Sequence, residues 1–117
     1  MATRVNIGKI ETKTAVQCFD AIVKYYKENE ITTILESKTA AEWVEFCESG
    51  FGGMESKDEP EVNDLVVMKT DSGKWHIAVC VEIGKIYHAS MKRGFVSRLK
   101  PYRRMIQGVF NVMGSSW

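Results

Sequence analysis

The sequence has no long hydrophobic run. No segment approaches the ~20 consecutive apolar residues that a membrane-spanning helix needs. The first residues, MATRVNIGKIETK, lack the apolar core of a secretory signal peptide. We therefore expect a protein with no membrane span that is synthesised in the cytoplasm and reaches any other compartment by a different route.

Cysteine and histidine are scarce. Cys18, Cys47 and Cys80 are an odd number of cysteines at wide spacing, which does not predict a disulfide framework. No CxxC or HxxxH spacing occurs, so a structural zinc site is not expected. We interpret Cys47 and Cys80 as buried packing residues.

Acidic residues are missing from the last part of the chain. Residues 1–82 hold 15 acidic and 9 basic residues, whereas residues 83–117 hold 7 basic residues and no acidic ones. We expect the two halves to fold together so that their charges interleave. A local basic patch remains, which could attract nucleic acid or other anionic polymers. It comprises Lys92, Arg93, Arg98, Lys100, Arg103 and Arg104.

The composition is that of a globular protein. Hydrophobic residues make up 44% of the 117 residues and charged residues 26%, which argues against intrinsic disorder. This length predicts a single domain over residues 1–117. Residues 1–12 are polar and are predicted to form an irregular arm.

Two amphipathic helices are predicted in the first half of the chain. The first has an apolar stripe at helical spacing, formed by Phe19, Ile22, Val23 and Tyr26. Thr14 is the preferred N-cap and Thr12 the second choice, so Cys18 would lie near the first turn. The second helix begins with the capping-box pattern Thr39-Ala-Ala-Glu42 and is expected to end at Gly50. Its apolar side comprises Trp43, Phe46 and Cys47.

The second half of the chain is typical of strands. Five short segments are predicted, at residues 65–68, 76–81, 86–88, 95–96 and 108–112. Residues 50–63 are rich in glycine and acidic residues and predict a surface connection. Two helices followed by strands predict an α+β fold, with the helices on one side of an antiparallel meander.

The loop between the second and third strands decides whether the two histidines can meet. A two-residue loop, Ile83-Gly84, would place His76 and His88 on opposite faces of the sheet. A three-residue loop that begins at Glu82 and has Gly84 at positive φ would make the histidines diagonal neighbours on one face. We predict the three-residue loop.

Cys18 is the candidate nucleophile. The positive end of a helix lowers the pKa of a cysteine, and a neighbouring imidazolium lowers it further. A thiolate and an imidazole, with a third group that orients the imidazole, form the general pattern of an activated nucleophile. We therefore expect iodoacetamide to alkylate Cys18 at a pH well below the pKa of about 8.5 of a free thiol.

Four short motifs carry a resemblance to a known family. Three strand motifs are Asn63-Asp-Leu-Val-Val-Met68, His76-Ile-Ala-Val79 and Ile86-Tyr-His-Ala-Ser90, and Gln17-Cys-Phe-Asp20 precedes them. They are similar to the GDLV, HVGIY and FIHAS strands and the DCSG or DCW nucleophile motif of NlpC-type papain-like cell-wall cysteine peptidases. The 12 residues between the two histidines agree with the family's spacing. The resemblance covers residues 14–112 and is strongest over 63–90.

The resemblance implies both a fold and an activity. The fold would be papain-like, with N-terminal helices packed on a five-stranded antiparallel sheet or half-barrel. Cys18 would be the nucleophile, His76 the general base and acid, and His88 the residue that orients His76. The family hydrolyses amide bonds in peptidoglycan stem peptides, often next to D-glutamate and diaminopimelate, and uses no metal or organic cofactor.

The short form of the chain is most similar to phage tail-assembly members of the family. Expected partners are the peptidoglycan peptide and phage tail or other assembly proteins. The protein would be virion-associated or delivered to the cell wall by a route other than a signal peptide. Nucleic acid is the less favoured partner.

Departures around Cys18 leave the substrate open. Gln17 replaces the family's aspartate, Phe19 and Asp20 replace small residues, and no aromatic residue precedes the cysteine. Gln17 is a candidate oxyanion donor together with the Cys18 backbone N–H. One alternative is a papain-like amidase or acyltransferase with another substrate. The other is a non-catalytic phage or effector assembly module, which could bind nucleic acid through residues 92–104.

Overall fold

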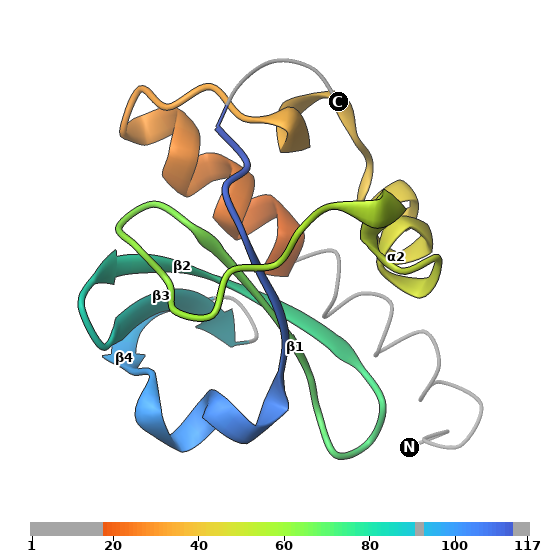
Figure 1. The fold of residues 1–117 in the computed structure, drawn as a ribbon. Coiled ribbons are helices and arrows are strands. Elements are labelled where there is room, and N and C mark those ends of the chain that lie inside the picture. Colours follow the sequence, from red (N-terminus) through yellow and green to blue (C-terminus); the bar gives the residue numbers. More distant parts are fainter. Residues whose placement is uncertain (1–17, 91–92, 114–117) are drawn as a thin grey trace, which may run out of the picture.

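The computed structural model describes residues 18–90 and 93–113 and has an α+β fold, as the sequence predicts (Figure 1). Residues 18–28 are helical. The helical segments that follow are η1 (Ile34–Ser37), α2 (Ala40–Glu48), η2 (Phe51–Gly53) and η3 (Lys100–Met105). The strands are β1 (Leu65–Lys69), β2 (Trp75–Glu82), β3 (Lys85–Ser90), β4 (Arg93–Arg98) and β5 (Ile106–Phe110). The predicted arm and the N-caps Thr12 and Thr14 lie outside the described residues.

The five strands form one antiparallel sheet in the order β4-β3-β2-β1-β5. The first four strands are the predicted meander. The prediction is wrong for β5, which returns to the opposite edge and pairs with β1 instead of β4. The reason is η3, whose early Pro101 favours a helical turn and which carries the chain back across one face of the sheet.

Both faces of the sheet are covered, which corrects the prediction of helices on one side only. The first helix and α2 lie on one face, and η3 lies on the other (Figure 1). Strand β1 is buried on both sides, because Leu65 and Val67 join the core under the helices while Val66 and Met68 join the core under η3. A strand buried on both faces reads as a continuous apolar run.

The first helix packs as its apolar stripe predicts. Phe19, Ile22 and Tyr26 are buried, and Val23 is partly buried against the same core. The Tyr26 hydroxyl donates a hydrogen bond to the carbonyl of Asn63 at 2.8 Å. The helix is therefore tied to the chain just before β1, and this helps to place its first described residue, Cys18, near the sheet.

Helix α2 begins at the predicted capping box. The Thr39 side chain accepts from the Glu42 N–H at 3.1 Å, and the Glu42 carboxylate accepts from the Thr39 N–H at 2.8 Å. Trp43 and Cys47 are buried, and Gly50 adopts positive φ just after the helix. The short segments η1 and η2 were not predicted, because they are too short to show a helical repeat.

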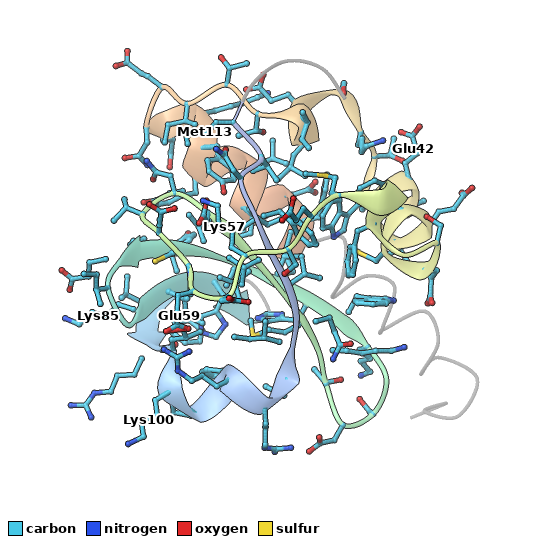
Figure 2. All side chains as sticks on the ribbon, in the orientation of Figure 1. Glu42, Lys57, Glu59, Lys85, Lys100 and Met113 are labelled. Atoms are coloured by element: carbon cyan, nitrogen blue, oxygen red, sulfur yellow. The ribbon has the colours of Figure 1, made fainter. Side chains whose placement is uncertain are left out.

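Charges from the two halves of the chain interleave. Arg103 forms two hydrogen bonds with Glu59, and Arg104 forms two with Asp71. The predicted basic patch therefore contains two paired arginines. Lys85 and Lys100 project from the surface near β3 and η3 (Figure 2). Within residues 18–90 and 93–113, no helix is long and apolar enough to span a membrane.

Candidate active site

Strands β2 and β3 pair in the predicted register, but the loop that joins them is shorter than predicted. Gly84 has φ of 77°, as predicted. Glu82 pairs with Lys85, so the turn contains only two residues, but a register shift follows between Cys80 and Glu82. This bulge has the same effect as the predicted third loop residue: Val79 pairs with Tyr87, and His88 lies on the same face as His76.

The structure brings Cys18, His76 and His88 into one hydrogen-bonded series. The Cys18 Sγ lies 3.4 Å from Nδ1 of His76. The Nε2 of His76 lies 2.9 Å from Nδ1 of His88. The two imidazole rings meet edge to face, with centroids 5.1 Å apart and an interplanar angle of 79°. The helix supplies the thiol, and two neighbouring strands supply the imidazoles.

Cys18 contacts His76 where the hydrogen-bonded pairing between β2 and β3 has ended. The pairing of these strands runs from the turn to Val79 and Tyr87. Beyond that pair, the Cys18 thiol lies 3.4 Å from the carbonyl oxygen of Ile77 and also interacts with the backbone of Ala89. The thiol thus contacts the backbone of both strands, which fixes its position relative to His76.

Ser97 extends the series and was missed by the sequence analysis. Its Oγ lies 2.8 Å from Nε2 of His88. Ser97 pairs with Ile86, so the β3–β4 register places its side chain diagonally to His88 on one face. The sequence offered a weak signal, a polar residue directly after the predicted strand segment 95–96. The partner could be named only once the register was known.

Aromatic rings enclose His88. The rings of Phe95 on β4 and Tyr102 on η3 lie with centroids 4.4 Å and 5.2 Å from that of His88. His88 is buried, and both of its ring nitrogens have partners. Its orientation is therefore set by packing as well as by hydrogen bonds.

The series has a consistent proton arrangement. When the Cys18 thiol donates to Nδ1 of His76, the His76 proton must reside on Nε2. That N–H donates to Nδ1 of His88, whose own proton then resides on Nε2 and is donated to Ser97 Oγ. We assign these tautomers from the hydrogen-bond network. In this arrangement, Nδ1 of His76 carries no proton and faces the thiol.

Burial favours the neutral forms of these groups. It raises the pKa of Cys18, although backbone hydrogen bonding to Ile77 and Ala89 opposes the rise. Burial, together with the neighbouring His88, lowers the pKa of His76 to about 4. Burial also lowers the pKa of His88. The resting site is therefore a neutral thiol next to a neutral imidazole.

The prediction of a low-pKa thiolate is thus wrong in direction for this structure. The Cys18 side chain is only 3% exposed, and the cost of burying a negative charge outweighs the local hydrogen bonds. The residues before Cys18 are not among those described, so the helix-terminus part of that prediction is untested. Proton transfer to His76 would therefore accompany attack on a substrate.

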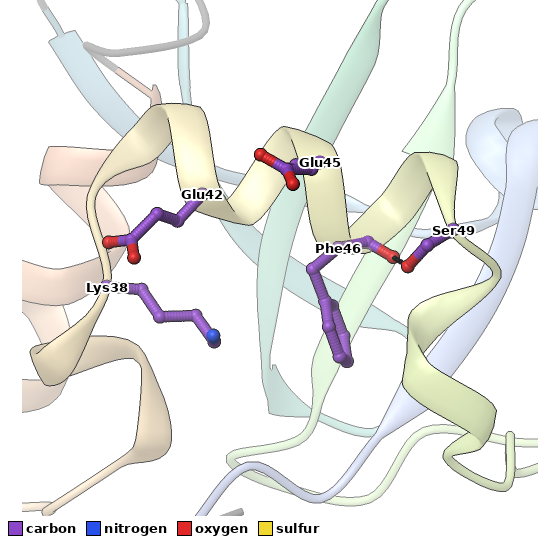
Figure 3. Close-up of a pocket in the computed structure, with 5 residues that line it drawn as sticks. All are labelled: Lys38, Glu42, Glu45, Phe46 and Ser49. Carbon is purple, nitrogen blue, oxygen red and sulfur yellow. Dashed lines mark hydrogen bonds between the residues drawn. The ribbon is translucent and has the colours of Figure 1, made fainter.

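A small, partly enclosed hollow lies beside the thiol. It has room for about one water molecule and is lined by Cys18, Phe19, Ala40, Trp43, Val44, Trp75, His76 and Ile77. A larger hollow lies on the outer side of α2, lined by Lys38, Glu42, Glu45, Phe46 and Ser49 (Figure 3). None of those residues belongs to the hydrogen-bonded series, so we place the candidate site at the smaller hollow.

The other predictions concern two further cysteines, a metal site and Gln17. Cys47 and Cys80 are buried free cysteines, as predicted for packing residues. In the described part of the chain, no group of three or more histidine, cysteine or acidic residues could hold a metal ion. Gln17, the candidate oxyanion donor, lies outside the described residues.

The chain matches no protein-family model and no curated protein. The interpretation of the site therefore depends on its own residues and geometry, together with the motif resemblance.

Proposed function

We propose that this chain is a papain-like cysteine hydrolase of the NlpC type that cleaves amide bonds in peptidoglycan stem peptides. The observation that carries the proposal is the series Cys18–His76–His88, with contacts of 3.4 Å and 2.9 Å. These residues come from three separate elements, and their roles match those of a nucleophile, a base and an orienting group. The motif resemblance supplies the substrate class.

The first step would form a thioester. The Cys18 sulfur attacks the carbonyl carbon of the scissile amide while Nδ1 of His76 accepts the thiol proton. The resulting imidazolium donates through Nε2 to the neutral Nδ1 of His88, which stabilises the positive charge. His76 then gives its proton to the leaving nitrogen, and the C–N bond breaks.

The second step would restore the thiol. His76 accepts a proton from a water molecule as the water oxygen attacks the thioester carbonyl carbon. The C–S bond breaks, a carboxylic acid is released, and the proton returns from His76 to sulfur. Each turnover consumes one water molecule and requires neither a metal nor a cofactor.

The charge distribution favours this proposal over a nucleic-acid-binding module. Arg103 and Arg104, two of the six residues in the basic patch, are paired with Glu59 and Asp71. Pairing reduces the positive potential that would attract a phosphate backbone. A phage tail or another assembly protein remains the partner that the resemblance suggests.

Purified peptidoglycan provides the test of this function. The protein is expected to release soluble peptide fragments with new amino groups, detected by mass spectrometry. Pretreatment with an alkylating reagent should abolish release, because sulfur is the nucleophile, whereas EDTA should have no effect. Release that survives alkylation but stops with EDTA, or no release at all, would contradict the proposal.

Ser97 is expected to act as a positioning residue. Ser97→Ala removes the acceptor of the His88 Nε2–H and allows the other tautomer, in which His88 presents an N–H to His76. We expect hydrolysis to fall about tenfold and to recover in Ser97→Thr, which keeps the hydroxyl. Nitrogen-15 shifts of His88 should show one tautomer in the wild type and a mixture in Ser97→Ala.

Ser72→Ala serves as the matched control, because Ser72 lies in the exposed turn after β1 and contacts only Thr70 among the hydrogen bonds of the described residues. This variant should keep both the hydrolysis rate and the His88 spectrum. An unchanged His88 spectrum in Ser97→Ala would show that Ser97 does not set the tautomer.

A further inference from the structure

The indole N–H of Trp43 is buried without a hydrogen-bond partner. The Trp43 side chain is 3% exposed, and its Nε1 is the single buried side-chain donor in the described residues that lacks an acceptor. By contrast, the Nε1 of Trp75 donates to the Glu48 carboxylate at 3.0 Å. An unpaired buried donor destabilises the folded protein, so its presence requires an explanation.

Trp43 lines the same hollow as Cys18 and His76. The rest of the lining is apolar or aromatic and includes Phe19 and Val44. Among the described residues, no carboxylate, lysine or arginine lines it. The residues that line the hollow thus include the candidate nucleophile, the candidate base and a tryptophan with an unpaired N–H, and the remaining walls favour an uncharged group.

The Trp43 ring is held in place by its neighbours. Its centroid lies 6.3 Å from that of Phe19 on the first helix and 5.5 Å from that of Phe46 on α2. The capping box at Thr39 fixes the beginning of the helix that carries it. A donor fixed before the ligand arrives needs little reorganisation when charge develops on the ligand.

We propose that the hollow, which has room for about one water molecule, receives the carbonyl oxygen that Cys18 attacks, and that the Trp43 N–H donates a hydrogen bond to this oxygen. This inference rests on the proposed nucleophilic role of Cys18 but not on peptidoglycan as the substrate. A carbonyl oxygen is an acceptor without a proton, so it complements the unpaired N–H. Its charge grows during attack, and the hydrogen bond strengthens at that moment.

Two thiol reagents of different chemistry test the proposal. With p-nitrophenyl acetate, a bond forms between Cys18 Sγ and the carbonyl carbon, p-nitrophenolate leaves, and the thiol proton passes through His76 to the buffer. With methyl methanethiosulfonate, a disulfide forms, methanesulfinate leaves, and the thiol proton again passes to the buffer, but no carbonyl takes part. Trp43→Phe should slow acetylation at least about tenfold and leave thiolation within about twofold of the wild type.

The stability of Trp43→Phe gives a second readout. The variant removes an unpaired donor but also leaves a smaller buried ring, and because these effects oppose one another its urea midpoint should stay close to that of the wild type. Phe46→Leu is the matched control, because Phe46 packs on the Trp43 ring from outside the hollow. It should leave the ratio of the two rates unchanged. Rates from Cys18→Ala are subtracted to remove reaction at Cys47 and Cys80.

A measurement on the wild-type protein does not depend on any variant folding. The indole N–H resonance of Trp43 should move downfield on acetylation, while that of Trp75 should stay in place. An unmoved Trp43 resonance, or equal acetylation rates in Trp43→Phe and the wild type, would overturn the inference. Acetylation that depends on Trp43 without cleavage of peptidoglycan would contradict only the proposed function. A Cys18 inert to both reagents would contradict both.

Discussion

Cys18→Ala and His76→Ala are each expected to lower peptidoglycan hydrolysis at least about 10³-fold. The first variant removes the nucleophile. The second removes the ring nitrogen that lies 3.4 Å from it and would accept its proton. Because burial raises the pKa of Cys18, few thiolates exist without that base. The double variant should be no slower than either single variant, since the two residues act as a unit.

Initial rates of fragment release provide the measurement, and Cys47→Ala provides the control. Cys47 is also a buried cysteine, and burial raises its pKa to about 12, but it lies outside the hydrogen-bonded series. Its removal should leave the rate close to that of the wild type. If Cys47→Ala were as slow as Cys18→Ala, the assignment of the nucleophile would be wrong.

The pH dependence of the same reaction tests the state of His76. Its pKa is lowered from the ordinary value of 6.5 to about 4, so the ring stays neutral, and able to accept a proton, down to about that pH. The acidic limb of the rate profile should therefore fall near pH 4. A limb close to pH 6.5 would mean that the imidazole is not desolvated in the free protein.

Phe110→Ala is expected to lower the free energy of unfolding by about 3–5 kcal/mol. Phe110 is 2% exposed, and its ring centroid lies 4.9 Å from that of Phe51. The ring also covers Gly108, where an added Cβ would lie 2.5 Å from it. The substitution would leave a cavity in the core that β5 shares with the helices, beside β1.

Urea denaturation followed by tryptophan fluorescence measures this effect. Ile83→Ala is the matched control, because Ile83 is 93% exposed in the β2–β3 turn. It should change the unfolding free energy by no more than about 0.5 kcal/mol. A small effect of Phe110→Ala would show that β5 contributes little to the core and that its position next to β1 needs another explanation.

Features that depend on residues close together in the sequence could be predicted from the sequence. The buried stripe Phe19, Ile22 and Tyr26 follows from helical periodicity, and the Thr39 capping box follows from a four-residue pattern. Gly84 adopts positive φ because a tight turn requires it and glycine permits it. The shared face of His76 and His88 followed from this turn and strand alternation, although the structure achieves it with a bulge.

Other features depend on segments that meet only when the chain folds. The position of β5 beside β1 depends on how η3 packs across the sheet, and the contact of Ser97 with His88 depends on the β3–β4 register. Cys18 and His76 are 58 residues apart, and the direction of their pKa shifts is set by burial, which a sequence pattern does not show. The sequence thus determined the first helix, α2, the approximate positions of the five strands and the candidates Cys18, His76 and His88. Tertiary packing decided how far the site is shielded from solvent, and therefore which protonation states Cys18, His76 and His88 adopt.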